Sequence, residues 1–185
     1  MYTGGFSAVV DASKLFHQFS TVENERKWLG MRHPKSDKLY RYTGLPMGSG
    51  SSPGLAGRYG NAFIRKLRTE CPAFREENGA TVNTWWQQFG NNQKMDEKLG
   101  FGRFGLGLDG LPVTFAWAHC DDFLLHGPTY EKTCEALSQF LDKTVEVGLL
   151  CHPKKLIPPS HVVKYCGFLF DTTTEPTLRI PIDKR

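Results

Sequence analysis

The chain is 185 residues long and 39% hydrophobic, which is enough apolar material to bury one core as a single domain over residues 1–185. It has no apolar run of the roughly 18 residues that cross a bilayer and no basic start followed by a long apolar stretch, so we expect neither a membrane partner nor a secretory signal. The net charge of +4 is uneven: residues 1–68 carry 11 Lys and Arg against 4 Asp and Glu, which fits a polyphosphate partner or an ordinary solvated surface.

The first elements alternate between strand and helix. Residues 5–11 (GFSAVVD) are a short apolar run that ends on Asp11, which predicts a buried strand with a carboxylate at its end. Residues 13–19 (SKLFHQF) predict one or two helical turns, and residues 38–43 (KLYRYT) predict a second strand. A turn rich in Gly, Ser and Pro comes next.

A long helix is predicted after that turn. Ser52 is expected to be its N-cap and Pro53 its first helical residue, the positions that these residue types favour. An amphipathic face is predicted from Leu55, Tyr59, Phe63 and Leu67. The basic residues expected to be partly available to phosphates are Arg58, Arg65, Lys66 and Arg68. Residues 69–111 lack clear periodicity and are interpreted as an insertion or long excursion.

The acidic pair Asp121–Asp122 lies between two β-rich apolar runs, which predicts a hairpin with the carboxylates at its tip. Pro128 is expected to open the next helix, and Gly148 is expected to end it in the C′ position. One face of this helix is predicted to carry Tyr130, Cys134, Leu137, Leu141 and Val145.

The last part of the chain predicts two more strands, at residues 161–171 and 177–182, on either side of a turn-rich segment. The order strand, helix, strand, helix, hairpin, helix, hairpin is typical of an α+β fold. We therefore expect an antiparallel sheet backed by helices.

The cysteines form no recognisable framework, because they are odd in number, scattered and free of CxxC spacing. They are Cys71, Cys120, Cys134, Cys151 and Cys166. We therefore expect reduced, buried thiols in an intracellular protein, with the nucleus and the cytoplasm both open.

Three carboxylates stand beside apolar sequence at strand ends: Asp11, Asp121 and Asp122. Unpaired carboxylates are costly there, and several together repel one another unless cations hold them. Hard cations such as Mg²⁺ take oxygen ligands and leave positions for substrate phosphates, and a pair of them can clamp both oxygens of a phosphoryl displacement. Taken singly, each aspartate is more often a turn former or a cap, so both interpretations stay open at this point.

Five segments along the chain each carry a distinctive motif. The first is VVDASKLFHQF, with an aromatic residue five positions after its aspartate, and the second is LYRYTGLPMGSGSSPGLAGRYGNAF, with a Leu-Pro-x-Gly turn and a Ser-Pro helix start. The third is the double-aspartate hairpin AHCDDFLL, the fourth is GLLCHPKK and the fifth is VKYCGFLFD. In this order they resemble the palm motifs of retrotransposon and retroviral reverse transcriptases, and together they cover nearly all of the chain outside residues 69–111.

The resemblance implies a polymerase palm: an α+β fold with a ferredoxin-like core, part of the fingers and no thumb. It implies an RNA-directed DNA polymerase of a retroelement, a nucleotidyltransferase that uses two Mg²⁺ or Mn²⁺ ions to add deoxynucleotides to a primer 3′ end. The implied partners are an RNA or DNA template with its primer, deoxynucleoside triphosphates and further domains of a longer polyprotein. The 185-residue chain by itself is expected to extend primers poorly or not at all.

The resemblance also assigns roles to single residues. Asp11 and Asp121 would bridge both metals and Asp122 would complete the site, while Lys155 would neutralise or protonate the leaving pyrophosphate. The implied nucleotide-binding residues are Ala12, Phe16, Gln18, Met47 and Gly48. The implied primer-binding residues are His119, Tyr165, Cys166 and Gly167. Phe16 would lie beneath the sugar and exclude a 2′-hydroxyl, although core packing explains it from the residues alone.

Two other interpretations remain open. A palm can persist as a nucleic-acid-binding or scaffold module without catalysis, or it can serve an RNA polymerase or terminal transferase. His119 departs from the tyrosine that is usual in the family two positions before Asp121, which concerns primer contact and not metal binding. Viral RNA-dependent RNA polymerases usually carry an aspartate where this chain has Phe16, and the difference favours deoxynucleotide use.

Overall fold

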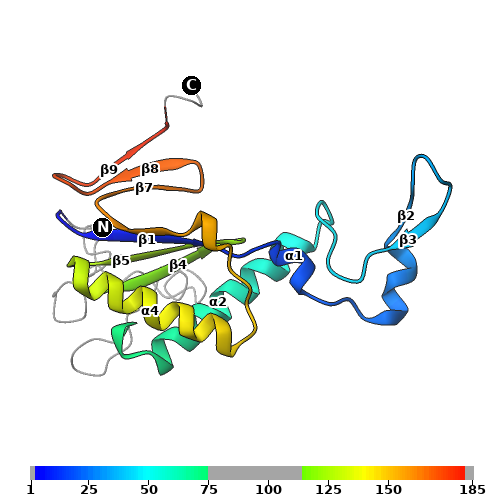
Figure 1. Ribbon diagram of the computed structural model, residues 1–185, viewed down its shortest axis with the longest axis horizontal. Coiled ribbons are helices and arrows are strands. Elements are labelled where there is room, and N and C mark those ends of the chain that lie inside the picture. The colour runs from blue at the N-terminus through cyan, green and yellow to red at the C-terminus, as the bar shows by residue number, and fades with distance from the viewer. Residues whose placement is uncertain (1–2, 75–113, 182–185) are drawn as a thin grey trace, which may run out of the picture.

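The computed structural model describes residues 3–74 and 114–181, and its centre is a four-stranded antiparallel sheet in the order β4-β5-β1-β6 (Figure 1). The strands of this sheet are β1 (Phe6–Asp11), β4 (Phe115–His119), β5 (Asp122–Gly127) and β6 (Ile157–Ser160). β1 therefore forms where the apolar run predicted a strand, and β4 and β5 form the hairpin predicted around the acidic pair.

Helices pack against one face of the central sheet and a second sheet lies over the other (Figure 1). The helices are α1 (Leu15–Gln18), α2 (Ser52–Glu70) and α4 (Tyr130–Glu146), with short 3-10 turns η1 (Glu23–Trp28), η2 (Pro72–Phe74) and η5 (Pro153–Lys155). The second sheet consists of β7 (Val162–Tyr165), β8 (Phe168–Asp171) and β9 (Thr177–Arg179). The predicted α+β layout, with antiparallel sheets backed by helices, is confirmed.

β1 is buried on both faces, which explains its continuous apolar sequence. Neighbouring residues of a strand point to opposite faces. Val10 packs in one cluster with Phe63 and Phe140 from the helices. Val9 packs in another cluster with Leu124 and Val163, toward the second sheet. The carboxylate end of β1 therefore emerges between two apolar layers.

The start of α2 differs from the prediction. Ser51 holds the N-cap position without a side-chain cap, and Ser52 and Pro53 are the first two helical residues. The buried Ser52 hydroxyl donates to the carbonyl oxygen of Pro46 at 3.0 Å, which ties the helix to the preceding turn. Of the predicted apolar face, Phe63 and Leu67 are buried and Tyr59 packs against the core, whereas Leu55 is 41% exposed. The buried residues of α2 are Ser52, Ala56, Gly60, Phe63, Ile64, Leu67 and Arg68.

α4 also turns a different face to the core than the apolar pattern predicts. It begins at Tyr130, after Pro128 and the N-cap Thr129, whose hydroxyl oxygen accepts a backbone amide of the first turn. Leu137 of the predicted face is buried, but Tyr130 and Val145 are exposed. The buried residues of α4 are Thr133, Ala136, Leu137, Phe140 and Thr144. Both threonine hydroxyls donate to carbonyl oxygens of the preceding turn, so their burial leaves no polar group unsatisfied.

The sequence pattern does not predict two of the strands. β6 contains two prolines and lies at the edge of the sheet beside β1, where a strand needs amide donors on only one side. β2 (Gly30–Arg32) pairs with β3 (Leu39–Arg41), which lies inside the predicted strand at 38–43. This exposed hairpin projects from the body of the molecule (Figure 1).

The start of the predicted excursion is ordered. Residues 69–74 complete α2 and form η2, whose Phe74 is buried in the main core. The remaining residues of the excursion, 75–111, lie outside the described residues. The end of α4 agrees with its prediction, because Gly148 follows the C-cap in the left-handed region at φ 72°.

All five cysteines lie within the described ranges and are free thiols, as predicted, although only Cys71 is fully buried. No helix within residues 3–74 or 114–181 combines the length and the apolar character that crossing a membrane requires.

Candidate functional site

Three polar side chains at one end of the central sheet share a face. Asp11 is the cross-strand partner of Asp122, and Asp122 is in turn the partner of His119. Directly opposed residues of antiparallel strands lie on the same face of a sheet. Side chains alternate along β1, so Asp11 points to the same side as Val9, toward the second sheet. The strand register therefore brings Asp11, Asp122 and His119 together.

Asp121 lies in the two-residue loop between β4 and β5, beside Cys120. Cys120 has a φ of 52°, a conformation that persists in a non-glycine residue only where the surrounding structure holds it. The amide of Ala12 donates to the carbonyl oxygen of Asp121 at 2.7 Å. This bond joins the hairpin tip to the residue after Asp11, so the three aspartates belong to one rigid corner.

The aspartates influence one another electrostatically. Burial raises the pKa of Asp122 above its ordinary value, and the charges of Asp121 and Asp11 raise it further. The positive charge of Lys155 and that of His119 oppose this rise. The corner is therefore crowded with negative charge and favours a cation.

Lys155 supplies one such cation. Its Nζ lies 2.8 Å from Oδ2 of Asp11, from a position 144 residues away in the sequence. The Asp11 side chain is 13% exposed and the Lys155 side chain is 59% exposed. The hydrogen bond to Asp11 raises the pKa of Lys155, and the charges of Asp121 and Asp122 add to the effect.

Backbone hydrogen bonds hold the Lys155 segment against the end of β1. The amide of His152 donates to the carbonyl oxygen of Asp11 at 2.8 Å. The amide of Ser13 donates to the carbonyl oxygen of Leu150 at 2.8 Å. The Gln18 side chain donates to the Leu150 carbonyl oxygen at 2.9 Å and accepts from the Leu150 amide at 2.8 Å. Gln18 therefore uses its amide group to position this segment, and its predicted contact with nucleotide stays a prediction.

The β7–β8 hairpin borders the acidic corner. Its turn residues Cys166 and Gly167 have φ values of 49° and 83°, as a two-residue hairpin loop with two left-handed residues requires. The Tyr165 hydroxyl donates to the carbonyl oxygen of Asp122 at 3.4 Å, and Sγ of Cys166 lies 4.0 Å from Oδ2 of Asp122. Burial raises the pKa of Cys166 to about 11, so the group beside Asp122 is a neutral thiol near pH 7. These predicted primer-binding residues lie next to the predicted metal ligands.

The other predicted nucleotide-binding residues lie in α1 and in the turn before α2. Phe16 is half-buried and packs against the main core, and its carbonyl oxygen accepts from the Leu45 amide at 3.1 Å. Two residues further along that turn, Met47 is 73% exposed, and Gly48 has a φ of 86°. Ala12 is fully buried at the end of β1. Core packing of Phe16 is thus observed, and its contact with a sugar stays a prediction.

The donor set at the corner suits a hard cation, because three carboxylates contribute oxygen ligands and a surplus of negative charge. Within residues 3–74 and 114–181, however, no group of three or more His, Cys, Asp or Glu side chains is arranged so that it could hold a metal ion. One oxygen of Asp11 is instead engaged by Lys155. Binding of a metal by Asp11, Asp121 and Asp122 would require these side chains to rearrange and the lysine to leave, and it stays a prediction.

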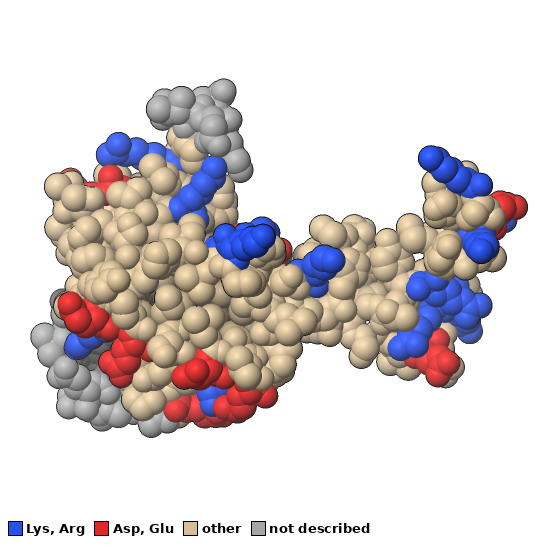
Figure 2. Space-filling view, viewed as in Figure 1, with Lys and Arg blue, Asp and Glu red and all other residues tan. Residues whose placement is uncertain are grey.

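Basic side chains gather on the projecting hairpin and on the turn that leads into it (Figure 2). These residues are Arg26, Lys27, Arg32, Lys35, Lys38 and Arg41. Two aromatic side chains are exposed among them, Trp28 at 74% and Tyr40 at 50%. We refer to residues 21–43 as the basic arm.

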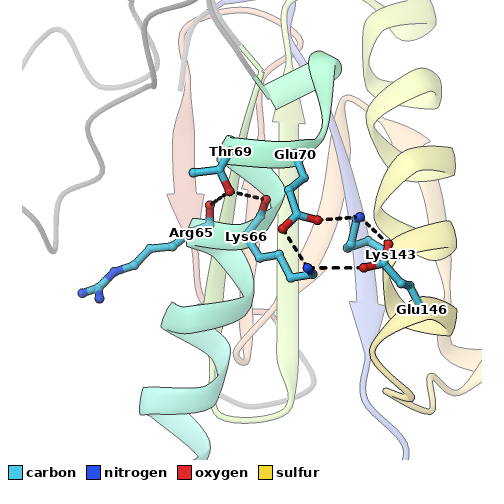
Figure 3. Close-up of polar contacts among 6 residues, drawn as sticks. All are labelled: Arg65, Lys66, Thr69, Glu70, Lys143 and Glu146. Carbon is cyan, nitrogen blue, oxygen red and sulfur yellow. Dashed lines mark hydrogen bonds and ion pairs between the residues drawn. The ribbon is translucent and has the colours of Figure 1, made fainter.

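Two of the four basic residues predicted to be available on α2, Lys66 and Arg68, are less accessible than expected. Arg68 is 4% exposed, which removes it from any phosphate surface. Lys66 forms ion pairs with Glu70 at 2.7 Å and with Glu146 at 3.3 Å, and Lys143 pairs with the same two glutamates (Figure 3). These pairs join the ends of α2 and α4. The other two predicted bases of α2 are exposed.

Comparisons with known proteins identify the fold. No protein-family model and no curated sequence matches the chain. The foamy viral protease-reverse transcriptase in complex with double-stranded DNA aligns over 96% of this chain, at a TM-score of 0.62 and 14% identity. The same viral protein with an RNA/DNA hybrid aligns over 96% at a TM-score of 0.62 and 15% identity, and the native prototype foamy virus protein over 88% at 0.57 and 15%. The fold is reverse transcriptase-like.

The chain spans 27%, 17% and 16% of the length of these three viral chains. Two positions that shape the corner are not predicted by the sequence, Cys120 and His152. A two-residue hairpin loop needs a residue at positive φ. The short spacing between the two apolar runs therefore indicates that a residue near Cys120 has a positive φ. The bond from His152 to Asp11 depends on tertiary packing and has no sequence counterpart.

Proposed function

We propose that this chain catalyses two-metal-ion nucleotidyl transfer as the palm of a retroelement RNA-directed DNA polymerase. The observation that carries the proposal is that Asp11, Asp121–Asp122 and Lys155 meet at one corner of a reverse transcriptase-like fold. They come from the beginning, the middle and the end of the sequence, and separate elements position each of them. Turn formation or capping alone does not require such a convergence.

The proposed chemistry assigns a task to each residue. Asp11, Asp121 and Asp122 would hold two Mg²⁺ or Mn²⁺ ions, which supply charge stabilisation to the attacking and leaving oxygens when bound. Lys155, whose side chain is largely exposed, can turn from Asp11 toward the triphosphate and neutralise or protonate the departing pyrophosphate.

The proposed partners are a primer with its RNA or DNA template and deoxynucleoside triphosphates. The similar viral protein was solved with double-stranded DNA and with an RNA/DNA hybrid. Tyr165 and Cys166 contact Asp122, so a primer end held by this hairpin would lie beside the carboxylates. The aromatic ring of Phe16 would lie below the sugar and disfavour ribonucleotides.

A catalytically idle nucleic-acid-binding module is the second candidate. The exposed cations and aromatic rings of the basic arm favour it, because such a surface binds nucleic acid without any chemistry. The Lys155–Asp11 pair is also compatible with a purely structural role for both residues. The two candidates differ in whether the carboxylates are needed for a covalent step.

Primer extension separates these candidates. The purified chain at high concentration would be given a labelled primer on an RNA or a DNA template, with Mg²⁺ or Mn²⁺ and either deoxynucleotides or ribonucleotides. We expect slow, template-dependent addition of deoxynucleotides that Asp121→Asn abolishes, with Lys132→Gln on α4 as a matched surface control.

Each outcome decides between the hypotheses. Nucleic-acid binding without addition by the wild-type chain, on either template and with either metal, would favour the idle module if Asp121→Asn also leaves Mn²⁺ binding unchanged. Equal use of ribonucleotides would favour an RNA polymerase or terminal transferase. Addition that survives Asp121→Asn would remove the carboxylates from the mechanism.

A further inference from the structure

We propose that Lys155 acts as an internal competitor for the metal site and thereby couples metal binding to triphosphate binding. Its ammonium group engages Oδ2 of Asp11, one of the two oxygens through which this carboxylate would bind a metal ion, so the site accepts metal readily only after a triphosphate draws the lysine away. This coupling rests on the proposed function, because it presupposes that the carboxylates bind metal.

The competition follows from the geometry at Asp11. The Asp11 side chain is 13% exposed, and Lys155 Nζ is 2.8 Å from its Oδ2. A metal ion at this oxygen would bring a second positive charge to the place where the ammonium lies. Like charges at such a distance repel strongly in partly buried surroundings, so lysine and metal exclude each other at Asp11.

The side chain of Lys155 can move away from Asp11 while the backbone around the acidic corner stays in place. Its backbone is anchored, because its amide donates to the His152 carbonyl oxygen at 3.0 Å and the His152 amide donates to Asp11 at 2.8 Å. Its side chain is 59% exposed and can rotate into solvent. Only the ammonium group needs to move, and it stays close enough to meet a phosphate bound beside the carboxylates.

The energetic consequence is a linkage between two ligands. Metal alone must break the Lys155–Asp11 pair and leave the ammonium without a partner. Metal together with a triphosphate gives the ammonium a new anionic partner. The two ligands therefore bind with positive cooperativity, and each strengthens the other by the same factor.

Manganese titration followed by electron paramagnetic resonance tests this coupling without measuring activity. Mn²⁺ affinity would be compared for the wild-type chain, Lys155→Met, Lys155→Arg and the neighbouring surface control Lys154→Met. We expect Lys155→Met to bind Mn²⁺ alone about fivefold or more tightly than the wild type, the lower end of common coupling strengths. Lys155→Arg and Lys154→Met should remain close to the wild type.

A second arm adds an exchange-inert Rh(III) complex of a deoxynucleoside triphosphate, which supplies the anion without chelating the added Mn²⁺. This complex should tighten Mn²⁺ binding to the wild type and have little effect on Lys155→Met. Equal or weaker Mn²⁺ binding by Lys155→Met would overturn the coupling while leaving the proposed metal site intact. If neither the wild type nor Lys155→Met binds Mn²⁺, the proposed function fails together with the coupling.

Discussion

The side chain of His126 lies near the end of β5 without solvent exposure, and its Nδ1 is 2.8 Å from the hydroxyl oxygen of Ser7 on β1. Burial lowers the pKa of His126 from 6.5 to about 3. Between these two pH values the unfolded chain binds a proton at this residue and the folded chain does not. The free energy of unfolding should therefore fall as the pH falls below 6.5.

We predict that His126→Asn removes the part of the pH dependence of the free energy of unfolding that His126 causes. Asparagine can keep a hydrogen bond to Ser7 and does not titrate. Urea unfolding between pH 5 and pH 7 should show the wild type losing up to about 1.4 kcal/mol per pH unit relative to the variant. The other histidines are present in both proteins and cancel in the comparison. If the free energy of unfolding changed with pH in the same way for both proteins, the burial of a neutral His126 would not be the cause of the pH dependence.

At the level of single residues, the sequence predicts the acidic corner better than it predicts the contacts around it. Asp11 and Asp121–Asp122 are recognisable because each stands where an apolar strand stops. The contact between Lys155 and Asp11 is not predicted, since it joins positions 144 residues apart and the resemblance implies only a role for Lys155 at the leaving pyrophosphate. Gln18 illustrates the contacts that the sequence does not predict. Its hydrogen bonds to Leu150 depend on the packed fold, and no local sequence pattern encodes them.

At the level of elements, the packing of α2 on β4 depends on one glycine. A β-carbon at Gly60 would lie 2.9 Å from the Ala118 β-carbon, closer than side chains approach in practice. Gly57, one helical turn earlier, has open space around such an atom. The two glycines form a matched pair in one helix.

We predict opposite effects for alanine at these two positions. Gly60→Ala should lower the free energy of unfolding by about 1–3 kcal/mol, because overpacking forces the helix away from the sheet. Gly57→Ala should raise it by about 0.5–1 kcal/mol, because alanine favours the helix and meets no obstacle. Chemical denaturation measures both, and adding Ala118→Gly should restore part of the stability that Gly60→Ala removes. Equal effects at both glycines would show that the close approach does not limit packing.

Gly60 also explains why the sequence predicts α2 but only part of its buried face, since Phe63 and Leu67 are buried as predicted. Periodicity finds a helix, whereas the buried face depends on what the neighbouring sheet can accommodate. In α2 the sheet requires small residues, so Ala56 and Gly60 are buried while Leu55 is 41% exposed. In α4 the apolar pattern also misses part of the buried face. The hydroxyl groups of Thr133 and Thr144 donate to carbonyl oxygens of the same helix, so these two residues can be buried where an apolar residue would be expected.

On the scale of the whole molecule, positive charge gathers on the basic arm (Figure 2), whereas Asp11, Asp121 and Asp122 lie at one end of the central sheet of the body. Negative charge on α2 and α4 is partly neutralised by Lys66 and Lys143. A polyanion that reached the corner would therefore be attracted by the arm and by Lys155.

We predict that replacing Lys35, Lys38 and Arg41 of the arm by glutamine weakens nucleic-acid binding and flattens its salt dependence. For every phosphate that the variant no longer neutralises, the slope of log K against log salt should become shallower by about 0.7–0.9. Fluorescence anisotropy at several salt concentrations measures the slope. Lys132→Gln on α4 serves as the control, and an unchanged slope in the triple variant would assign the arm to an ordinary solvated surface.

The proposed metal centre is tested most directly by anomalous diffraction from crystals soaked with Mn²⁺ and a non-hydrolysable deoxynucleoside triphosphate. We expect anomalous peaks bounded by the carboxylates of Asp11, Asp121 and Asp122, with Lys155 turned from Asp11 toward the phosphates. In crystals of Asp121→Asn these peaks should be weak or missing. Manganese bound only elsewhere, with the Lys155–Asp11 pair intact beside the triphosphate, would contradict the assignment of this corner as a nucleotidyl-transfer site.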